Sequence, residues 1–206
     1  AVCDHNASEN VPYVIRAAAG RALTVLPGME VTSREEVHLL ALFDKTDGLQ
    51  RLQNIVNAHM TGTNDEERFG CQAIVNEADE VEGFSERLLI GATELALSDL
   101  VRQIHVFGGL AIASHIDRES FSVISQLGFI DPEIPFDALE ISCRTGAANA
   151  RRQYPELSGY AFLTSSDAHR LEDIGKARTA FLMEEPTVRE LKMAFSGQSG
   201  RRIASF

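Results

Sequence analysis

Short runs of apolar, β-favouring residues alternate along the chain with amphipathic segments, and this alternation restricts the fold more than any other feature. It is typical of βα units and of a mainly parallel sheet. The pattern predicts strands over residues 1–3, 23–26, 37–43, 110–113, 138–141, 160–163 and 179–183. It predicts helices over residues 9–19, 48–59, 97–107, 119–127 and 146–152, and a last helix after the capping residue Thr187. The expected fold class is therefore α/β.

Residues 61–90 interrupt this alternation. Their first five residues are rich in turn formers, and the segments 72–75 and 81–84 have the pattern of two strands that pair as a hairpin. We interpret the stretch as an insertion or lid-like excursion. Since 206 residues suit one domain, residues 1–206 are expected to form a single domain that carries this insertion.

The charge and cysteine content exclude several classes of protein. A net charge of −11 argues against a broad duplex-binding surface, which needs Lys and Arg to displace counterions. A small phosphorylated substrate or a nucleic-acid end stays compatible with this charge, because bound metal ions supply positive charge locally. Three widely spaced cysteines without a CxxC pair favour the reducing cytoplasm over a disulfide framework. No apolar run reaches the length of a membrane span.

Histidine and acidic side chains gather at the ends of the predicted strands. His5, Glu30, His115, Asp167 and His169 each follow such a strand, and His38 lies at the start of one. The C-terminal ends of parallel barrel strands open on one face, where active sites lie. Imidazole and carboxylate are ligands that suit zinc, manganese or iron. Each residue singly has an ordinary structural explanation, but the coincidence at five strand ends predicts that all six converge on one metal site.

Two arginines and two other histidines lie outside this set of six. Arg118 lies three residues after His115, and its planar guanidinium is suited to contact a phosphate group. We interpret Arg144, after the strand at 138–141, as a partner of surface acids. His59 and His105 lie on predicted helices away from strand ends, and we interpret them as ordinary helix residues.

The ordered motifs resemble those of the polymerase-and-histidinol-phosphatase (PHP) family. They are Asp4-His5-Asn6, then Leu26-Pro27-Gly28-Met29-Glu30-Val31-Thr32, His38, Ala113-Ser114-His115 and Ser165-Ser166-Asp167-Ala168-His169. The resemblance covers nearly the whole chain. It implies a distorted (β/α)7 barrel of TIM-like form, up to three divalent metal ions (zinc, manganese or iron) and hydrolysis of phosphoesters.

The resemblance also implies a role for each candidate residue. The implied metal ligands are His5, Glu30, His38, His115, Asp167 and His169. Glu30 would bridge two metals and complete one site with His38 and His115; His5 and His169 would serve a second metal, and Asp167 a third with Glu30. The expected catalytic residues are Glu30, His115, Arg118 and Asp167. Hydroxide held by the metal would attack phosphorus in line while the cations neutralise the phosphoryl oxygens.

One departure from the family leaves alternatives open. The family's HxH motif precedes its Asp-His motif, and no such motif precedes Asp4 in this sequence. The barrel is therefore expected to lack its first strand, with an open edge beside residues 1–3 that another segment or subunit covers. The chain is then either part of a longer enzyme or a degenerate module that binds metal or a partner without turnover. A metal-dependent amidohydrolase would use a bridging Lys, and no Lys lies at a predicted strand end.

Overall fold

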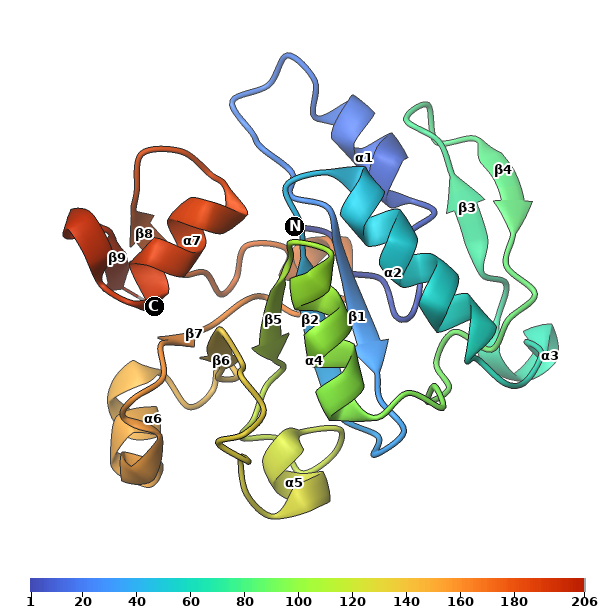
Figure 1. The fold of residues 1–206 in the computed structure, drawn as a ribbon. Coiled ribbons are helices and arrows are strands. Elements are labelled where there is room, and N and C mark those ends of the chain that lie inside the picture. The colour runs from blue at the N-terminus through green and yellow to red at the C-terminus, as the bar shows by residue number, and fades with distance from the viewer. Residues whose placement is uncertain (206) are drawn as a thin grey trace. The chain divides into compact units, whose positions relative to one another are not determined.

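The computed structural model describes residues 1–205, which divide into two compact units (Figure 1). The first unit runs from Ala1 to Leu110 and the second begins at Ala111. The elements of the first unit are α1 (Val11–Ala17), β1 (Gly28–Thr32), β2 (His38–Leu42), α2 (Thr46–Ala58), α3 (Glu66–Phe69), β3 (Ala73–Val75), β4 (Val81–Phe84) and α4 (Leu97–Val106).

The strands β1 and β2 form an antiparallel hairpin, in which Thr32 pairs with His38. Ser33 closes the loop: its N–H donates to the carbonyl of Val37 at 2.9 Å, and its Oγ accepts the Val37 N–H at 3.3 Å. The predicted strand at 37–43 is confirmed. The predicted strand at 23–26 is wrong, because Leu23 is 62% exposed and the buried strand begins at Gly28.

The helices α2 and α4 contribute buried apolar side chains to the core of the first unit and confirm two predictions. Apolar side chains at helical spacing are buried on both: Leu49, Leu52 and Val56 on α2, and Leu100, Val101 and Ile104 on α4. Each such burial stabilises the fold by about 1.5–3 kcal/mol. The predicted start of α4 at Leu97 is confirmed, and the carboxylate of Glu35, in the β1–β2 loop, accepts the Leu97 N–H at 2.9 Å. Neither these helices nor any other among residues 1–205 is long and apolar enough to cross a membrane.

The ring of Phe43 is 1% exposed and packs against the backbone at two glycines. A Cβ atom at Gly48 would lie 2.7 Å from Phe43 Cδ1, and one at Gly109 would lie 2.6 Å from Phe43 Cε1. A Cβ atom would also lie 2.8 Å from the Phe107 carbonyl oxygen at Gly48 and 2.9 Å from that of Leu42 at Gly109. Real Cβ atoms do not approach so closely, so both positions need glycine.

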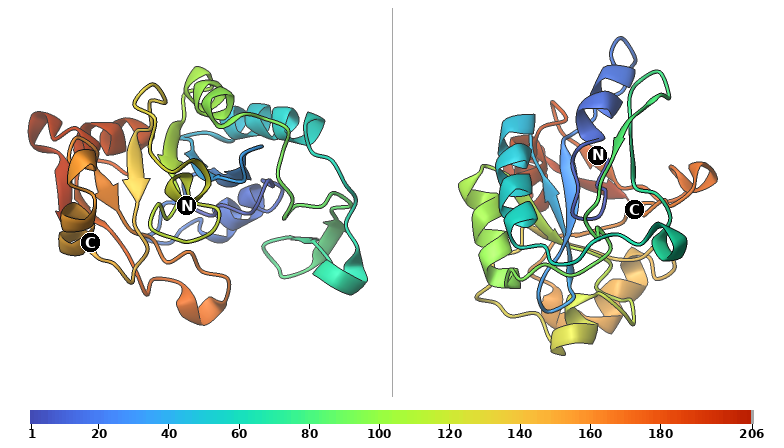
Figure 2. Two further views of the ribbon diagram at one scale, coloured as in Figure 1. Left: turned by 90° about the horizontal axis from the view of Figure 1, so that it is seen from below. Right: turned by 90° about the vertical axis from the view of Figure 1, so that its right-hand side faces the viewer.

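The excursion at 61–90 contains the short helix α3 and the hairpin of β3 and β4. As predicted, β3 and β4 pair antiparallel, with Ala73 opposite Phe84. The hairpin runs beside α1 (Figure 2, right). Asn10 Oδ1 accepts the Val75 N–H at 2.9 Å, and Arg16 Nε lies 2.9 Å from a Glu77 carboxylate oxygen.

The second unit holds the parallel part of the fold. Its elements are β5 (Leu110–Ala113, starting at the last residue of the first unit), α5 (Val123–Leu127), β6 (Ala138–Glu140), α6 (Ala147–Gln153), η1 (Pro155–Leu157), β7 (Phe162–Leu163), η2 (Leu171–Asp173), β8 (Ala180–Leu182), α7 (Val188–Phe195), η3 (Gln198–Gly200) and β9 (Arg202–Ser205). β5, β6 and β7 form a parallel ladder, with Ile112 opposite Ala138 and Leu139 opposite Phe162.

The end of the chain differs from the sequence-based expectation. β9 was not predicted, and it pairs antiparallel with β8. Thr187 caps α7 by accepting the Glu190 N–H at 3.2 Å, but Arg201 binds the Glu190 carboxylate, so the predicted reciprocal capping box does not form. The α/β class is confirmed. The parallel ladders within one unit are those of β5, β6 and β7, and among the described residues the ladders of either unit do not close into a barrel.

Candidate metal centre

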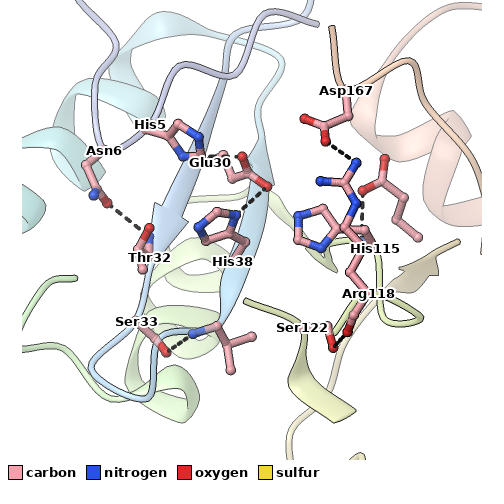
Figure 3. Close-up of polar contacts among 12 residues, drawn as sticks. His5, Asn6, Glu30, Thr32, Ser33, His38, His115, Arg118, Ser122 and Asp167 are labelled. Carbon is pink, nitrogen blue, oxygen red and sulfur yellow. Dashed lines mark hydrogen bonds and ion pairs between the residues drawn. The ribbon is translucent and has the colours of Figure 1, made fainter. Parts of the chain in front are cut away.

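Two imidazoles and one carboxylate meet in the first unit and form the His-Glu-His triad of His5, Glu30 and His38 (Figure 3). His5 Nδ1 lies 3.4 Å from Glu30 Oε2, and His38 Nδ1 lies 3.4 Å from Glu30 Oε1. The imidazole centroids are 4.9 Å apart, with the planes inclined by 59°. One potential ligand atom from each of the three residues lies within 4.8 Å of the other two.

The register of the β1–β2 hairpin brings Glu30 and His38 together. Glu30 is directly opposite Leu40, so His38 lies at the diagonal position on the same face of the pair. Diagonal neighbours on an antiparallel pair are within reach of long side chains. The expectation that Glu30 follows a parallel strand is therefore wrong, because Glu30 lies in the middle of β1 and reaches His38 across an antiparallel ladder.

The N-terminal segment brings His5 to the other side of Glu30. Bridges join Val2 to Pro27 and His5 to Glu30, both in parallel orientation. The Glu30 N–H donates to the carbonyl of Asp4 at 3.1 Å, and the Asn6 N–H donates to the carbonyl of Glu30 at 2.9 Å. These two hydrogen bonds fix the backbone on either side of His5 against β1.

The donor set and its spacing fit a divalent metal ion. A tetrahedral ion with bonds of about 2.0–2.1 Å separates its ligand atoms by roughly 3.3 Å, close to both nitrogen–oxygen distances. Because each imidazole faces a different oxygen of Glu30, the carboxylate is suited to bridge two ions. The side chains of Glu30 and His38 are 8% and 12% exposed, and that of His5 is 29% exposed.

A cavity of about 250 Å³ borders the triad at His5. Its lining includes Asp4 and Glu9 and, from the β3–β4 excursion, Gln72 and Ile74. Burial raises the pKa of Asp4 above its usual value, although a hydrogen bond from Asn10 at 3.2 Å and the nearby His5 oppose this shift.

The remaining candidate residues belong to the second unit. The Arg118 guanidinium forms an ion pair with the Asp167 carboxylate (Figure 3). His169 is 66% exposed, and its Nδ1 lies 3.0 Å from the Asp167 carbonyl and 3.8 Å from the Asp167 carboxylate. Thus the structure groups three sequence-predicted ligands in the first unit, and Arg118, Asp167 and His169 in the second.

His115 and Asp167 both have strained backbones. Their φ angles are +26° and +44°, in a region that non-glycine residues rarely occupy. Such strain costs on the order of 1–3 kcal/mol and persists where the surroundings enforce it, frequently at functional sites. At His115 the enforcing contacts come from Glu140, whose carboxylate accepts the His115 N–H at 3.0 Å and whose carbonyl accepts the Ile116 N–H at 2.8 Å.

Two residues around the candidate site were not singled out from the sequence. Glu140 is 4% exposed and supports the strained backbone at His115. Asn6 is fully buried beside His5 and forms hydrogen bonds to three other segments. Glu140 could have been identified from the sequence, because it is an acidic residue inside the apolar strand predicted at 138–141. Asn6 is part of the motif Asp4-His5-Asn6, but its role was not predicted from the sequence, because all of its partners are backbone groups or distant in sequence.

Asp117 gives the second unit a pH-dependent contact. Its carboxylate accepts the Ser142 N–H at 2.8 Å, the Ser142 hydroxyl at 2.6 Å and the Thr145 hydroxyl. Burial by itself raises the pKa of Asp117, but these hydrogen bonds outweigh burial and hold the pKa below the ordinary value of 3.8 for an aspartate.

Asp117→Asn is therefore expected to lower the free energy of unfolding by about 1–3 kcal/mol near neutral pH, the range for losing hydrogen bonds to a charged group. Because the folded-state pKa is depressed, the stabilisation is present above pH 3.8 and is lost as the pH falls through the folded-state pKa. Urea unfolding at pH 7, 5 and 3 tests this. A deficit in the variant that is as large at pH 3 as at pH 7 would contradict it.

Comparisons with known proteins agree with the resemblance seen in the sequence. Residues 148–196 match a family model described as PHP-associated. The uncharacterised protein YqxK of Bacillus subtilis (strain 168) is 32% identical over 113 residues, which are 51% of this chain and 28% of that protein. The resemblance to the PHP family is thus supported independently of the motifs quoted above.

Two solved structures have a similar fold. The lesion-specific endonuclease PfuEndoQ from Pyrococcus furiosus matches with a TM-score of 0.64 and 17% identity, over 85% of this chain and 40% of that chain. Endonuclease Q in complex with a 27-mer duplex substrate with an abasic lesion matches with a TM-score of 0.60 and 18% identity, over the same shares. At this identity the likeness shows a shared α/β fold. The chain spans less than half the length of each of these proteins.

Proposed function

We propose that this chain is the metal-binding part of a phosphoesterase that hydrolyses a phosphomonoester or a phosphodiester. The observation that carries the proposal is the His-Glu-His triad, in which the two oxygens of Glu30 face two different imidazoles at 3.4 Å. Imidazole nitrogen and carboxylate oxygen are the protein ligands of catalytic zinc, so a carboxylate between two imidazoles is a suitable donor set for divalent ions. The PHP-associated match and the fold shared with two endonucleases support the same reaction class.

Each candidate residue has a defined task in this proposal. When bound, divalent zinc, manganese or iron supplies Lewis acidity and lowers the pKa of water. Glu30 orients the two imidazoles and carries the negative charge that retains the cations. We propose His115, Asp167 and His169 as further metal ligands, and the planar guanidinium of Arg118 as the group that binds phosphoryl oxygens. In the whole protein we propose that residues 1–206 contribute to one domain built on a distorted (β/α)7 barrel.

The proposed substrate is a nucleotide, a sugar phosphate or a nucleic-acid end. The cavity beside His5 provides room for the alcohol side of the ester next to the triad. Charge favours the second unit for contact with a nucleic acid: residues 1–110 contain 8 Lys and Arg against 17 Asp and Glu, whereas residues 111–206 contain 11 against 13. The reducing cytoplasm remains the proposed location, on the basis of the cysteine spacing.

Metal-dependent hydrolysis tests the proposal. The metal-free protein, reloaded with Mn²⁺ or Zn²⁺, is expected to hydrolyse 4-nitrophenyl phosphate, bis(4-nitrophenyl) phosphate or an abasic-site oligonucleotide duplex, and EDTA is expected to abolish turnover. Supply of the metal alone should restore it. Turnover that EDTA leaves unchanged, with metal content verified as zero by elemental analysis, would exclude the mechanism.

A non-catalytic metal-binding module is the second candidate. The ion pair between Arg118 and Asp167 favours it, because this pair already neutralises a proposed ligand carboxylate. Stoichiometric metal binding without hydrolysis of any of the three substrates would support this alternative. Hydrolysis that disappears in Arg118→Ala while metal binding persists would support the enzyme.

A further inference from the structure

Asn6 is the residue after His5, and it is fully buried with a backbone φ of +50°. Asparagine accepts this left-handed conformation more readily than most residues. The conformation turns the chain away from the β1 edge directly after His5 and directs the Asn6 side chain into the protein (Figure 3).

Every hydrogen-bonding group of Asn6 has a partner. Its Nδ2 donates both hydrogens, to the carbonyl of Leu89 at 2.9 Å and to that of Gly91 at 2.8 Å. Its Oδ1 accepts the Thr32 N–H at 3.0 Å. On the main chain, the N–H donates to Glu30, and the carbonyl accepts Gln53 Nε2 at 3.0 Å.

The side-chain and main-chain contacts of Asn6 together join four segments: the segment with His5, the strand with Glu30, the helix α2 and the end of the β3–β4 excursion. A second set of hydrogen bonds joins the chain just after the excursion to β1. Thr93 N–H and Thr93 Oγ1 both donate to the carbonyl of Thr32, at 3.0 and 2.8 Å. The residue opposite His38 is therefore held from both sides, by Asn6 at its N–H and by Thr93 at its carbonyl.

Only the asparagine side chain can form all three of these side-chain hydrogen bonds. The two carbonyls of residues 89 and 91 need donors, and the Thr32 N–H needs an acceptor. Aspartate has nearly the same shape and keeps the acceptor, but it would place a carboxylate oxygen against two carbonyl oxygens, and a buried charge without donors is costly. Glycine keeps the backbone conformation but removes all three side-chain bonds.

We propose that Asn6 is a positioning residue for the His-Glu-His triad, which makes the metal affinity of the triad depend on the segment 89–91 of the excursion. The proposal rests on the proposed function in one respect, that the triad binds a metal. Asn6 itself is not a metal ligand. It sets the distance from His5 to Glu30 through the backbone on both sides, and it transmits displacements of the excursion to both residues.

The test compares Asn6→Asp and Asn6→Gly with the parent protein. Both variants are expected to raise the dissociation constant for Zn²⁺ by about 10–100-fold, the range for residues that orient metal ligands from outside the coordination shell. Competition against a chromophoric chelator measures this constant. The visible spectrum of the Co²⁺-loaded protein should also change, because it reports the geometry of the ligands and not the stability of the fold.

Asn64→Asp is the matched control, since Asn64 Nδ2 donates to a backbone carbonyl, that of Gly70, at 2.8 Å within the same excursion but away from Asn6. It should keep the parent's affinity and Co²⁺ spectrum. If both Asn6 variants fail to fold, Gln53→Met removes the donor to the Asn6 carbonyl and serves instead. Affinity and spectrum unchanged in a folded variant would overturn the proposal.

The imidazole NMR signals of the metal-free protein separate this proposal from the proposed function. The ring signals of His5 are expected to shift in Asn6→Asp, and those of His105, on α4, are not. If the parent protein binds no metal, the proposed function fails while the His5 signals still decide the role of Asn6. If metal binds and turnover occurs but the His5 signals and the affinity stay fixed, Asn6 has no positioning role and the proposed function stands.

Discussion

Glu30→Gln is expected to weaken binding of Zn²⁺ and Mn²⁺ by more than about 100-fold and to abolish metal-dependent turnover. Glutamine keeps the volume of the side chain but has one oxygen in place of two and no charge, so it cannot face both imidazoles as an acceptor. The loss should exceed the 10–100-fold typical of residues that only orient a ligand. Isothermal titration calorimetry on metal-free protein measures the affinity.

Glu86→Gln is the control for this experiment, because Glu86 is an exposed acid on the excursion. The control separates loss of a ligand from loss of one unit of negative charge. Equal affinities in Glu30→Gln and Glu86→Gln would show that the triad is not a metal site.

Phe43→Ala is expected to lower the free energy of unfolding by about 3–5 kcal/mol, the range for emptying a buried phenylalanine position. The ring is 1% exposed and fills space that Gly48 and Gly109 leave beside it, so neither glycine has a side chain that can move into the cavity. Urea unfolding followed by circular dichroism measures the change.

Phe69→Ala serves as the comparison, since Phe69 is 51% exposed and its loss should cost less than about 1 kcal/mol. A double variant, Phe43→Ala with Gly48→Ala, should not recover the stability, because a Cβ atom at Gly48 would still lie 2.8 Å from the carbonyl oxygen of Phe107. Failure of Phe43→Ala to destabilise the protein beyond Phe69→Ala would show that the ring is not a core element.

Local periodicity was sufficient to predict much of the fold. The helix α2 followed from the apolar spacing of Leu49, Leu52 and Val56, and the hairpin β3–β4 followed from two β-rich runs around a turn. The strand β1 was misplaced because the prediction chose the apolar run before Pro27. The burial of the polar Glu30 depends on neighbours that the local pattern does not contain.

Three of the six predicted ligands lie together, but not for the reason expected from the sequence. Residue type identified His5, Glu30 and His38, and the structure groups them. The expected cause, parallel strands that end on one face, does not apply to Glu30 and His38, which meet through the register of an antiparallel hairpin. Strand direction is not encoded in residue periodicity, so the sequence alone did not distinguish these two geometries.

The contacts of Asn6 have a consequence for the order in which the candidate metal centre assembles during folding. Glu30 and His38 belong to one hairpin and need only local chain closure, whereas Asn6 reaches Leu89 across 83 residues and Gly91 across 85. Long-range contacts form slowly, because the entropy of loop closure is lost before the contact is gained. We therefore expect a half-formed site, one carboxylate and one imidazole, to exist early in folding, and His5 to join it last. Metal ions present during refolding would then retain the N-terminal segment and accelerate the final phase, whereas ions added afterwards would only bind the finished site.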